Sequence, residues 1–291
     1  MAMLLGLANG TVPRSPELFT DDLAAQWAEL GIRCISTSFS RARVEVGRYA
    51  QRIKSVLSEK GIHVAQFAGV NANFVHHDVA VRKSGRESVF EAIAAVKSIG
   101  ATMISSGCGT NSDDFESHFY APHPLNYTEA ARDRLVDELR SIAPAIEDAG
   151  ILYTIECHQL SVMRTPEIIR SVLDEVDSPA IFANFDPVNL LDSAQAVFDN
   201  GRRMSSMVET VGPRYGPSCH IKDVAVSTDF VCHIVEVAPG EGVLDFEAFF
   251  AAAATLPGPT PLIVEHLSGD QVSAAIDFVR QKAHDSGVVL L

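Results

Sequence analysis

The fold of this chain is best indicated by four short stretches of its sequence: ILYTIECH (151–158), IFANFDP (181–187), SCHIKD (218–223) and LIVEHL (262–267). Each is apolar and rich in β-branched or aromatic residues, as in a buried strand. Each also carries a metal-capable side chain at or near its end: Glu156, Asp186, His220 and Glu265. The intervals between these residues are close to the roughly 31 residues per strand-helix unit of an eightfold barrel. We therefore expect the four side chains to converge on one site.

Four further apolar runs precede these, at residues 3–8, 33–39, 63–70 and 103–109. Segments with helical spacing lie between the runs, and alternation of strand and helix predicts a parallel sheet covered by helices. Eight such units are typical of one (β/α)8 TIM barrel of about 250 residues. The sequence contains no linker or low-complexity tract, so we predict a single TIM-barrel domain over residues 1–291.

Helix-end signals follow the same rhythm. Starts are indicated at Ser15-Pro16-Glu17, Thr128-Glu129 and Thr165-Pro166-Glu167. Four glycines stand shortly before strands, where a left-handed residue can end a helix: Gly31, Gly61, Gly100 and Gly150.

Composition narrows the class of function. The formal net charge of −14 argues against nucleic acid, because binding to phosphate backbones needs clustered Lys and Arg. No apolar run is long enough to span a bilayer, and the first residues lack the basic start of a secretory signal. Five cysteines without C-x-x-C spacing predict reduced, mostly buried thiols. We expect a cytoplasmic protein, with homo-oligomerisation left open.

The four strand-end residues predict a metal centre. Two glutamates, an aspartate and a histidine suit one divalent ion, Mn²⁺ first among Mg²⁺, Co²⁺ and Zn²⁺. A salt bridge or helix cap would explain any one of them alone, but one cation explains all four, because it offsets the repulsion between clustered carboxylates.

Three strand-to-helix connections are long: 71–83, 110–127 and 225–243. In a barrel such loops surround the pocket at the C-terminal ends of the strands. Their polar residues are candidate substrate contacts, although ordinary surface positions would explain each one singly: Asn71, Asn73, His76, His77, Asn111, His118, His123 and Asn126.

Two more residues are expected beside the metal. His158 stands two residues beyond Glu156 and would share its pleat direction, as a substrate donor or as a structural histidine. Lys222 stands two beyond His220, where it would bind a substrate carboxylate or phosphate, stabilise an oxyanion, or pair with Asp223 or another carboxylate. His266 should point to the opposite face and is interpreted as structural.

The stretches TIECH, NFDPVN, CHIKD, EVAPGEGVLDF and IVEH resemble the xylose isomerase-like, apurinic-endonuclease-like barrel superfamily, a sugar phosphate isomerase and epimerase group. The resemblance implies Glu156, Asp186, His220 and Glu265 as metal ligands, and Glu156 and Glu265 as the two groups that transfer the proton. Gly240 and Gly242 match a family turn and are expected to serve backbone geometry.

Two departures from the family pattern matter. Asn189 stands where the superfamily's endonucleases have an extra zinc-binding histidine, and Glu236 stands near the position of a second one. One metal is therefore expected rather than three, and DNA repair is disfavoured. The expected substrate-binding residues are His158, Asn189, Lys222, Glu236 and His123.

The resemblance and the ligand set together predict a metal-dependent isomerase or epimerase of a small sugar or hydroxy-ketone, working through an enediolate. A lyase or dehydratase that eliminates a group from a keto-sugar, inosose or dehydroshikimate-like substrate is the alternative, and Lys222 favours it. A third hypothesis is a non-catalytic barrel, or a barrel subunit that depends on a partner.

Overall fold

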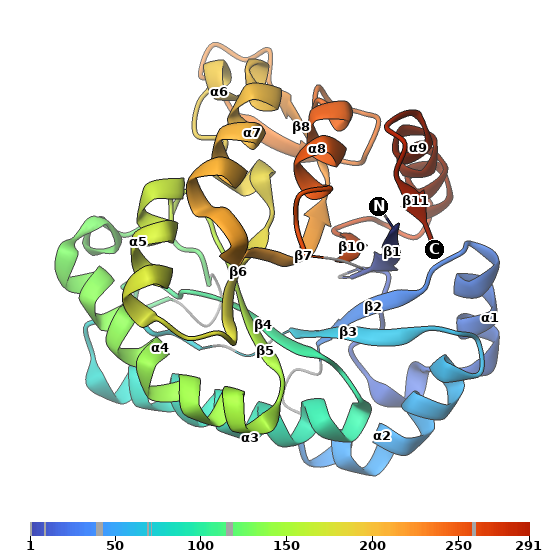
Figure 1. Ribbon diagram of the computed structural model, residues 1–291, viewed down its shortest axis with the longest axis horizontal. Coiled ribbons are helices and arrows are strands. Elements are labelled where there is room, and N and C mark those ends of the chain that lie inside the picture. The colour runs from blue at the N-terminus through green and yellow to red at the C-terminus, as the bar shows by residue number, and fades with distance from the viewer. Residues whose placement is uncertain are drawn as a thin grey trace.

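The computed structural model describes residues 2–8, 10–38, 43–68, 70, 72–114, 119–257 and 260–291, without the side chains of residues 16 and 43–49. Its central element is a closed parallel barrel, seen in Figure 1 as a ring of strands inside a ring of helices. The eight barrel strands are β1 (Ala2–Leu7), β2 (Cys34–Ser38), β3 (His63–Ala68), β4 (Met103–Gly107), β5 (Leu152–Glu156), β6 (Ile181–Phe185), β7 (Tyr215–Ile221) and β10 (Thr260–Val264).

Neighbouring strands pair in chain order, and the ring closes where β10 pairs with β1. In that closing pair Leu5 lies opposite Leu262, and both side chains are fully buried. The two-residue strand β11 (Val289–Leu290) adds to β1 from outside the ring. The predicted (β/α)8 barrel is confirmed.

The α-helices cover the outside of the ring (Figure 1). They are α1 (Asp21–Glu29), α2 (Arg43–Ser58), α3 (Val79–Ile99), α4 (Glu129–Ala149), α5 (Pro166–Val176), α6 (Ala194–Phe198), α7 (Asn200–Val211), α8 (Phe246–Ala253) and α9 (Val272–Asp285). Short 3₁₀ helices lie at η1 (Pro16–Leu18), η2 (Pro124–Tyr127), η3 (Pro187–Leu190) and η4 (Gly212–Arg214). None of the described helices is both long and apolar enough to cross a membrane.

Every predicted strand is present, but most end earlier than expected. The fifth ends at Glu156 rather than His158, and the last at Val264 rather than Leu267. The polar residues that follow leave the hydrogen-bonded ladder, because there the chain turns toward the next helix. The pleat alternation therefore cannot be extended past these ends to place His158 or His266.

Helix caps follow the sequence signals with one correction. Thr128 and Thr165 cap α4 and α5, and Gly100 and Gly150 end α3 and α4 with left-handed backbones. The signal at Ser15-Pro16-Glu17 instead opens η1, and α1 begins after Thr20, whose hydroxyl accepts from the Leu23 N–H. The prediction for the first helix was wrong because a Pro at the first position also suits a 3₁₀ turn.

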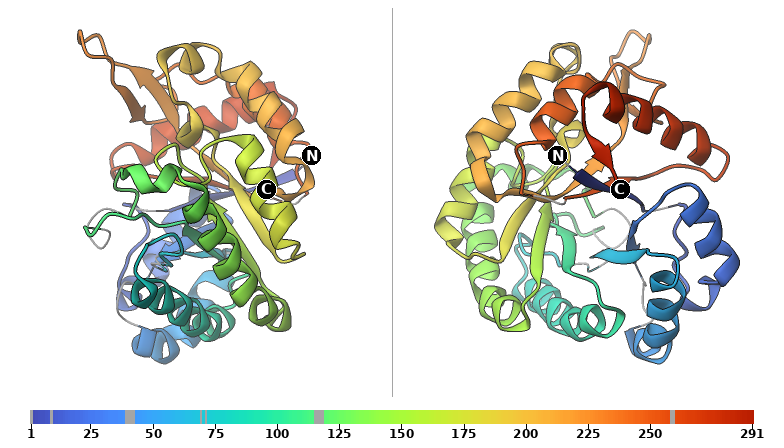
Figure 2. Two further views of the ribbon diagram at one scale, coloured as in Figure 1. Left: turned by 90° about the vertical axis from the view of Figure 1, so that its left-hand side faces the viewer. Right: turned by 45° about the vertical axis from the view of Figure 1, so that its right-hand side comes forward.

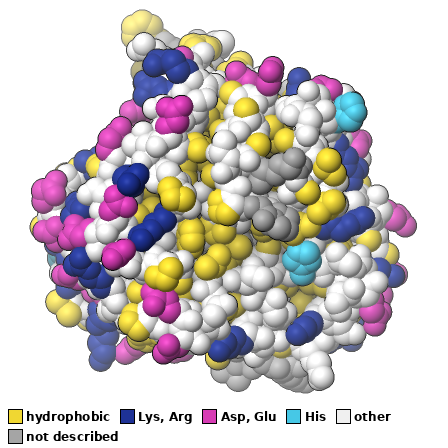
Figure 3. All heavy atoms as spheres, viewed as in Figure 1, with side chains coloured by type: hydrophobic (Ala, Val, Ile, Leu, Met, Phe, Trp, Pro, Cys, Tyr) yellow, Lys and Arg dark blue, Asp and Glu magenta, His cyan; other side chains and the backbone are white. Residues whose placement is uncertain are grey.

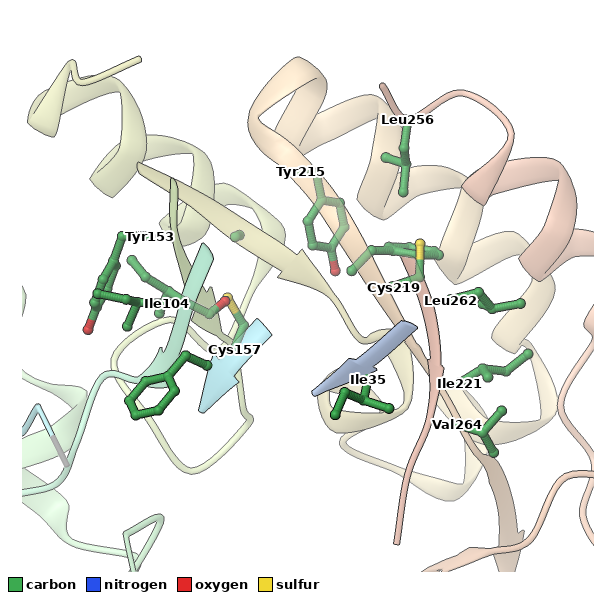
Figure 4. Close-up of a cluster of buried hydrophobic side chains, with 14 of the residues drawn as sticks. Ile35, Ile104, Tyr153, Cys157, Tyr215, Cys219, Ile221, Leu256, Leu262 and Val264 are labelled. Carbon is green, nitrogen blue, oxygen red and sulfur yellow. The ribbon is translucent and has the colours of Figure 1, made fainter. Parts of the chain in front are cut away.

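The core fills the barrel and the space beneath the helices. Figure 4 shows part of it, where Tyr153, Tyr215, Cys219 and Leu262 lie among other buried side chains from several strands. On the face shown in Figure 3, apolar side chains gather in the middle and charged ones lie at the periphery. Four cysteines are buried as predicted, whereas Cys232 is exposed.

The predicted loop 225–243 is not irregular. It holds most of an antiparallel hairpin of β8 (Asp223–Val226) and β9 (Ile234–Val237), which stands away from the barrel in Figure 2. Asp223 anchors the turn that follows, since its carboxylate accepts backbone N–H groups from Val224, Gly240, Gly242 and Leu244. A Cβ at Gly242 would lie 2.3 Å from Asp223 Oδ1, which confirms that this glycine serves backbone geometry.

Candidate metal centre

The four predicted ligands do converge. Glu156 ends β5, Asp186 follows β6, His220 lies in β7 and Glu265 follows β10, and their donor atoms all lie within 4.8 Å of one another. Asp186, His220 and Glu265 are buried, and Glu156 is partly exposed. Successive parallel strands bring their carboxyl ends to the same side of a barrel, which explains why residues 30 to 45 positions apart meet here.

A chain of buried polar side chains orients the histidine. His220 Nε2 lies 3.1 Å from Gln66 Oε1. The Gln66 amide in turn donates to Ser218 Oγ at 2.7 Å, and Ser218 donates to Asn184 Oδ1 at 2.5 Å. Because Gln66 offers an acceptor, Nε2 keeps its hydrogen and Nδ1 is the nitrogen left for a metal.

The carboxylates are held by two other side chains. Asn189 donates one amide nitrogen to Asp186 Oδ2 at 2.7 Å and to Glu156 Oε1 at 3.1 Å. Lys222 Nζ lies 2.6 Å from Glu265 Oε1, 3.0 Å from Asp186 Oδ2 and 3.5 Å from Glu236 Oε2. Lys222 thus pairs with ligand carboxylates rather than with Asp223.

The charges of this cluster shift its pKa values in opposite directions. Burial, and then the neighbouring Glu265 charge, raise the pKa of Glu156. Burial would also raise the pKa of Glu265, but His220 and Lys222 together outweigh it and hold that pKa well below its usual range. Burial opposes the charge of Lys222, yet four surrounding carboxylates keep its pKa well above the ordinary value. Glu265 is therefore held ionised, whereas the ionised form of Glu156 is disfavoured unless more positive charge is added to the cluster.

These residues fit a divalent ion. Among the described residues, neither Asp186 Oδ1 nor His220 Nδ1 finds a hydrogen-bond partner, although both atoms are buried. A buried polar atom without a hydrogen bond is costly, and each of these two belongs to the predicted ligand set. Carboxylate oxygens with one imidazole nitrogen are a donor set for Mn²⁺, Mg²⁺, Co²⁺ or Zn²⁺.

His158 does lie beside the cluster, but a loop contact rather than the pleat places it there. Its ring stacks on Tyr120 with centroids 4.9 Å apart, and its Nδ1 accepts the Leu160 N–H at 3.1 Å. Burial, followed by the charges of Asp186 and Lys222, perturbs its pKa, which is lowered overall. The backbone contact leaves Nε2 as the hydrogen-bearing nitrogen, a donor available to a substrate.

Glu236 and His266 form the rim of the site. Glu236 lies in β9, and its Oε1 is 2.7 Å from His266 Nδ1. His266 takes a left-handed backbone with φ of 59°, which turns its side chain toward Glu236. The expectation that His266 points away was therefore wrong, because the strand has already ended at Val264. Both residues line a cavity of about 430 Å³ together with Val237, Ala238, Glu241, Glu265, Leu267 and Gln271.

The other loop candidates hold the loops together. His123 caps η2 by accepting the Leu125 N–H at 3.2 Å, which is a local role. Asn126 is buried and donates to Leu160 O at 3.0 Å, and Asn73 donates to Thr110 O at 2.8 Å. Asn71 and His118 lie outside the described residues.

Sequence reasoning missed Gln66, Tyr120 and His266. Gln66 lies inside β3, where a lone polar residue gives no local signal of a partner 154 positions away. Tyr120 lies close to β4, since a Cβ at Gly107 would stand 2.6 Å from its hydroxyl. A strand that ends on glycine was the one available hint that a bulky group packs there.

Comparison with known proteins agrees with this architecture. The family model described as xylose isomerase-like TIM barrel matches residues 24–282. The chain belongs to this family. No curated protein matches it.

Solved structures share the fold at low identity. D-psicose 3-epimerase with D-tagatose from Clostridium cellulolyticum H10 is 14% identical, with a TM-score of 0.69 over 96% of this chain and 99% of that one. 3-Keto-D-glucoside 4-epimerase from E. coli is 16% identical, with a TM-score of 0.68 over 97% of this chain and 99% of that one. A xylose isomerase-like TIM barrel protein from Mycobacterium smegmatis in complex with magnesium is 17% identical, with a TM-score of 0.66 over 97% of this chain and 95% of that one.

Proposed function

We propose that this protein is a divalent-metal-dependent isomerase or epimerase of a small sugar or sugar-like hydroxy-ketone. The observation that carries the proposal is the cluster of Glu156, Asp186, His220 and Glu265, in which buried polar atoms of Asp186 and His220 make no hydrogen bond. Family membership and the similar fold of two proteins named as sugar epimerases support it. Mn²⁺ is the ion we expect first.

A bound divalent ion would polarise the substrate carbonyl and make the neighbouring C–H proton easier to remove. The protein's own part is to move that proton. Glu156 and Glu265 stand on the outer two of the four successive strands β5, β6, β7 and β10, so they flank the site from two sides. Proton removal by one and return by the other inverts a carbon, and return to the adjacent carbon isomerises the substrate.

The surrounding residues orient this pair. Asn189 holds one oxygen of Glu156, and Lys222 holds Glu265 Oε1, so that each carboxylate has a defined direction. His158, whose Nε2 carries hydrogen, can donate to a substrate oxygen. Such fixed donors reduce the reorganisation that a reaction requires.

The contacts of Lys222 favour isomerisation over elimination. A lyase would use this ammonium to bind a leaving group or an oxyanion, but its nitrogen is directed at three protein carboxylates and its side chain is 1% exposed. The third alternative, a barrel that needs a partner to complete its site, is disfavoured because one chain supplies all four donors.

The test is metal content followed by proton exchange. We expect about one divalent ion per wild-type chain by elemental analysis and loss of that ion in Glu156→Ala/Asp186→Ala. The metal-loaded protein should then incorporate deuterium from D₂O into a ketose, seen by NMR, without a change in the mass of the carbon skeleton. No metal after soaking with Mn²⁺, Mg²⁺, Co²⁺ and Zn²⁺, together with no exchange, would contradict the proposal.

A further inference from the structure

Two features that could bind an anionic substrate group are already occupied by the protein's own carboxylates. The first is Lys222, the lysine at the centre of the site. Its nitrogen lies within 3.5 Å of oxygens from Asp186, Glu236 and Glu265. An ammonium has three hydrogens to donate, and here three acidic side chains surround it. Lys222 donates to Glu265 Oε1 at 2.6 Å and forms ion pairs with Asp186 and Glu236, so the protein's own carboxylates already balance its charge.

The second feature is the glycine-containing turn after β9. In TIM barrels the loops after the seventh and eighth strands often bind phosphate through backbone N–H groups. Here such a nest exists, but Asp223 fills it. Asp223 Oδ1 accepts from Val224 N at 2.8 Å and Leu244 N at 2.9 Å, and Oδ2 accepts from Gly240 N and Gly242 N at 3.0 Å each.

The cavity beside the metal centre is also negative. Its charged lining consists of Glu236, Glu241 and Glu265, with His266 paired to Glu236 and no Lys or Arg among the described lining residues. Glu156 and Asp186 add two more carboxylates to these three. Their combined formal charge exceeds that of Lys222 and a divalent ion together, so the site would stay negative with the metal bound. A phosphate dianion would meet repulsion there.

Two of the described arginines that contact the neighbouring loops, Arg134 in α4 and Arg164 after β5, are engaged elsewhere. Arg134 donates to Val75 O at 2.9 Å and to Asn111 Oδ1 at 3.2 Å. Arg164 lies over the Tyr127 ring, 5.1 Å from its centroid, and donates to Val162 O. These contacts hold the loops, so neither guanidinium is placed to bind an anion at the metal centre.

We infer that the substrate carries neither phosphate nor carboxylate and is an uncharged polyhydroxy ketone that the site binds through its hydroxyl oxygens. This inference rests on the proposed function and narrows it, because the superfamily resemblance alone leaves sugar phosphates open. The acidic side chains of the cavity, Glu236 and Glu241, are suited to accept hydrogen bonds from sugar hydroxyls.

The test compares matched substrates. Deuterium exchange in D₂O is measured for D-fructose against D-fructose 6-phosphate and D-fructuronate, and for D-ribulose against D-ribulose 5-phosphate, with Mn²⁺-loaded protein. We expect kcat/KM for the neutral member to exceed that for its charged partner by at least about tenfold, since like charges disfavour the wrong ligand. A preference for a phosphate ester or the uronate would overturn the inference and leave the proposed function standing.

A second measurement separates the two ideas if no sugar exchanges. Line broadening of the ³¹P signal of inorganic phosphate is recorded with the full chain loaded with diamagnetic Mg²⁺, for wild type, Lys222→Met and the surface control Lys83→Met. Failure of exchange would count against the proposed function. Saturable phosphate binding that only Lys222→Met weakens would overturn the inference, whereas no saturable binding supports it.

Discussion

The described part of the chain contains two groups of histidine and carboxylate side chains whose ligand atoms lie within 4.8 Å of one another: Glu156, Asp186, His220 and Glu265, and His76, His77 and Asp113. By distance alone they are equal candidates for a metal. Their hydrogen bonds differ. We call them the strand-end group and the loop group.

The difference lies in which histidine nitrogen the protein already engages. In the strand-end group Gln66 accepts from His220 Nε2, and Nδ1 faces the carboxylates. In the loop group the Asp78 N–H donates to His76 Nδ1, which leaves Nε2 as the hydrogen-bearing atom toward Asp113, 3.9 Å away. A metal at that Nε2 would require the tautomer with its hydrogen on Nδ1, which would break the contact with the Asp78 N–H.

The surroundings reinforce this contrast. Arg82 donates to the carbonyl oxygens of both His76 and His77, so the loop group has a guanidinium close by. The side chain of Asp113 is 96% exposed, whereas Asp186 is fully buried. The lesson is that proximity of donors does not define a metal site; the orientation of their lone pairs does.

The largest expected effect is on the rate of deuterium exchange, which should fall in a variant of the strand-end group but not in a variant of the loop group. Glu265→Gln should lower the rate of deuterium exchange by about 10²–10⁴-fold, because it removes a proton-transfer group. The fold should persist, as the barrel core does not include this carboxylate. Asp113→Asn is the matched control in the loop group and should exchange like wild type. Equal losses in both variants would remove the distinction.

Metal affinity should show the next largest effect. His220→Ala is expected to weaken Mn²⁺ binding by more than about 100-fold, beyond the loss typical of an outer partner. His77→Ala should bind Mn²⁺ as wild type does. Isothermal titration calorimetry measures both. A His77→Ala variant that loses metal would make the loop group the true site.

The orientation of His220 should depend on Gln66. Gln66→Met removes the acceptor that keeps hydrogen on His220 Nε2 while preserving bulk in β3. Mn²⁺ affinity should fall by about 10–100-fold. Ser218→Ala, one bond further along the same chain of contacts, should cost less. If Gln66→Met binds Mn²⁺ normally, the orientation of His220 does not depend on this residue.

The smallest expected effect is a pH dependence. Burial lowers the pKa of His220, but Glu265 and Asp186 outweigh it and raise the pKa to about 10. The ring is therefore protonated at pH 7 to 9, and a metal must displace a proton. Mn²⁺ affinity should rise with pH, by up to about tenfold per unit. Burial and then His77 lower the pKa of His76, so His76 offers no such proton.

Proton release can be measured directly by calorimetry in buffers of different ionisation enthalpy. About one proton per bound ion is expected at pH 8. A metal affinity that is flat across this range would contradict the assignment of His220 as a ligand.

The convergence of Glu156, Asp186, His220 and Glu265 could be predicted from sequence because each lies at or near the end of a run with a clear strand pattern. Parallel strands of one barrel bring those ends together whatever the helices between them contain. The role of Lys222 could be predicted only as one of several alternatives, since its partners Asp186, Glu236 and Glu265 come from three different elements.

His158 and His266 show where sequence reasoning fails. Both follow the last residue of a strand, and past that point side-chain direction depends on the backbone of a loop. For His266 the left-handed φ of 59° reverses the expected direction. For His158 the expected neighbourhood was correct, but stacking on Tyr120 secures it.

The sequence by itself determined the barrel, its eight strands and the four residues that end beside one another, because apolar strand-like runs and helix caps are local properties. Only the tertiary structure decided which lone pairs face the centre, and that Lys222 and the glycine turn are filled by the protein's own carboxylates. Those features depend on contacts between residues such as Gln66 and His220, which are far apart in the chain and meet only when the barrel closes.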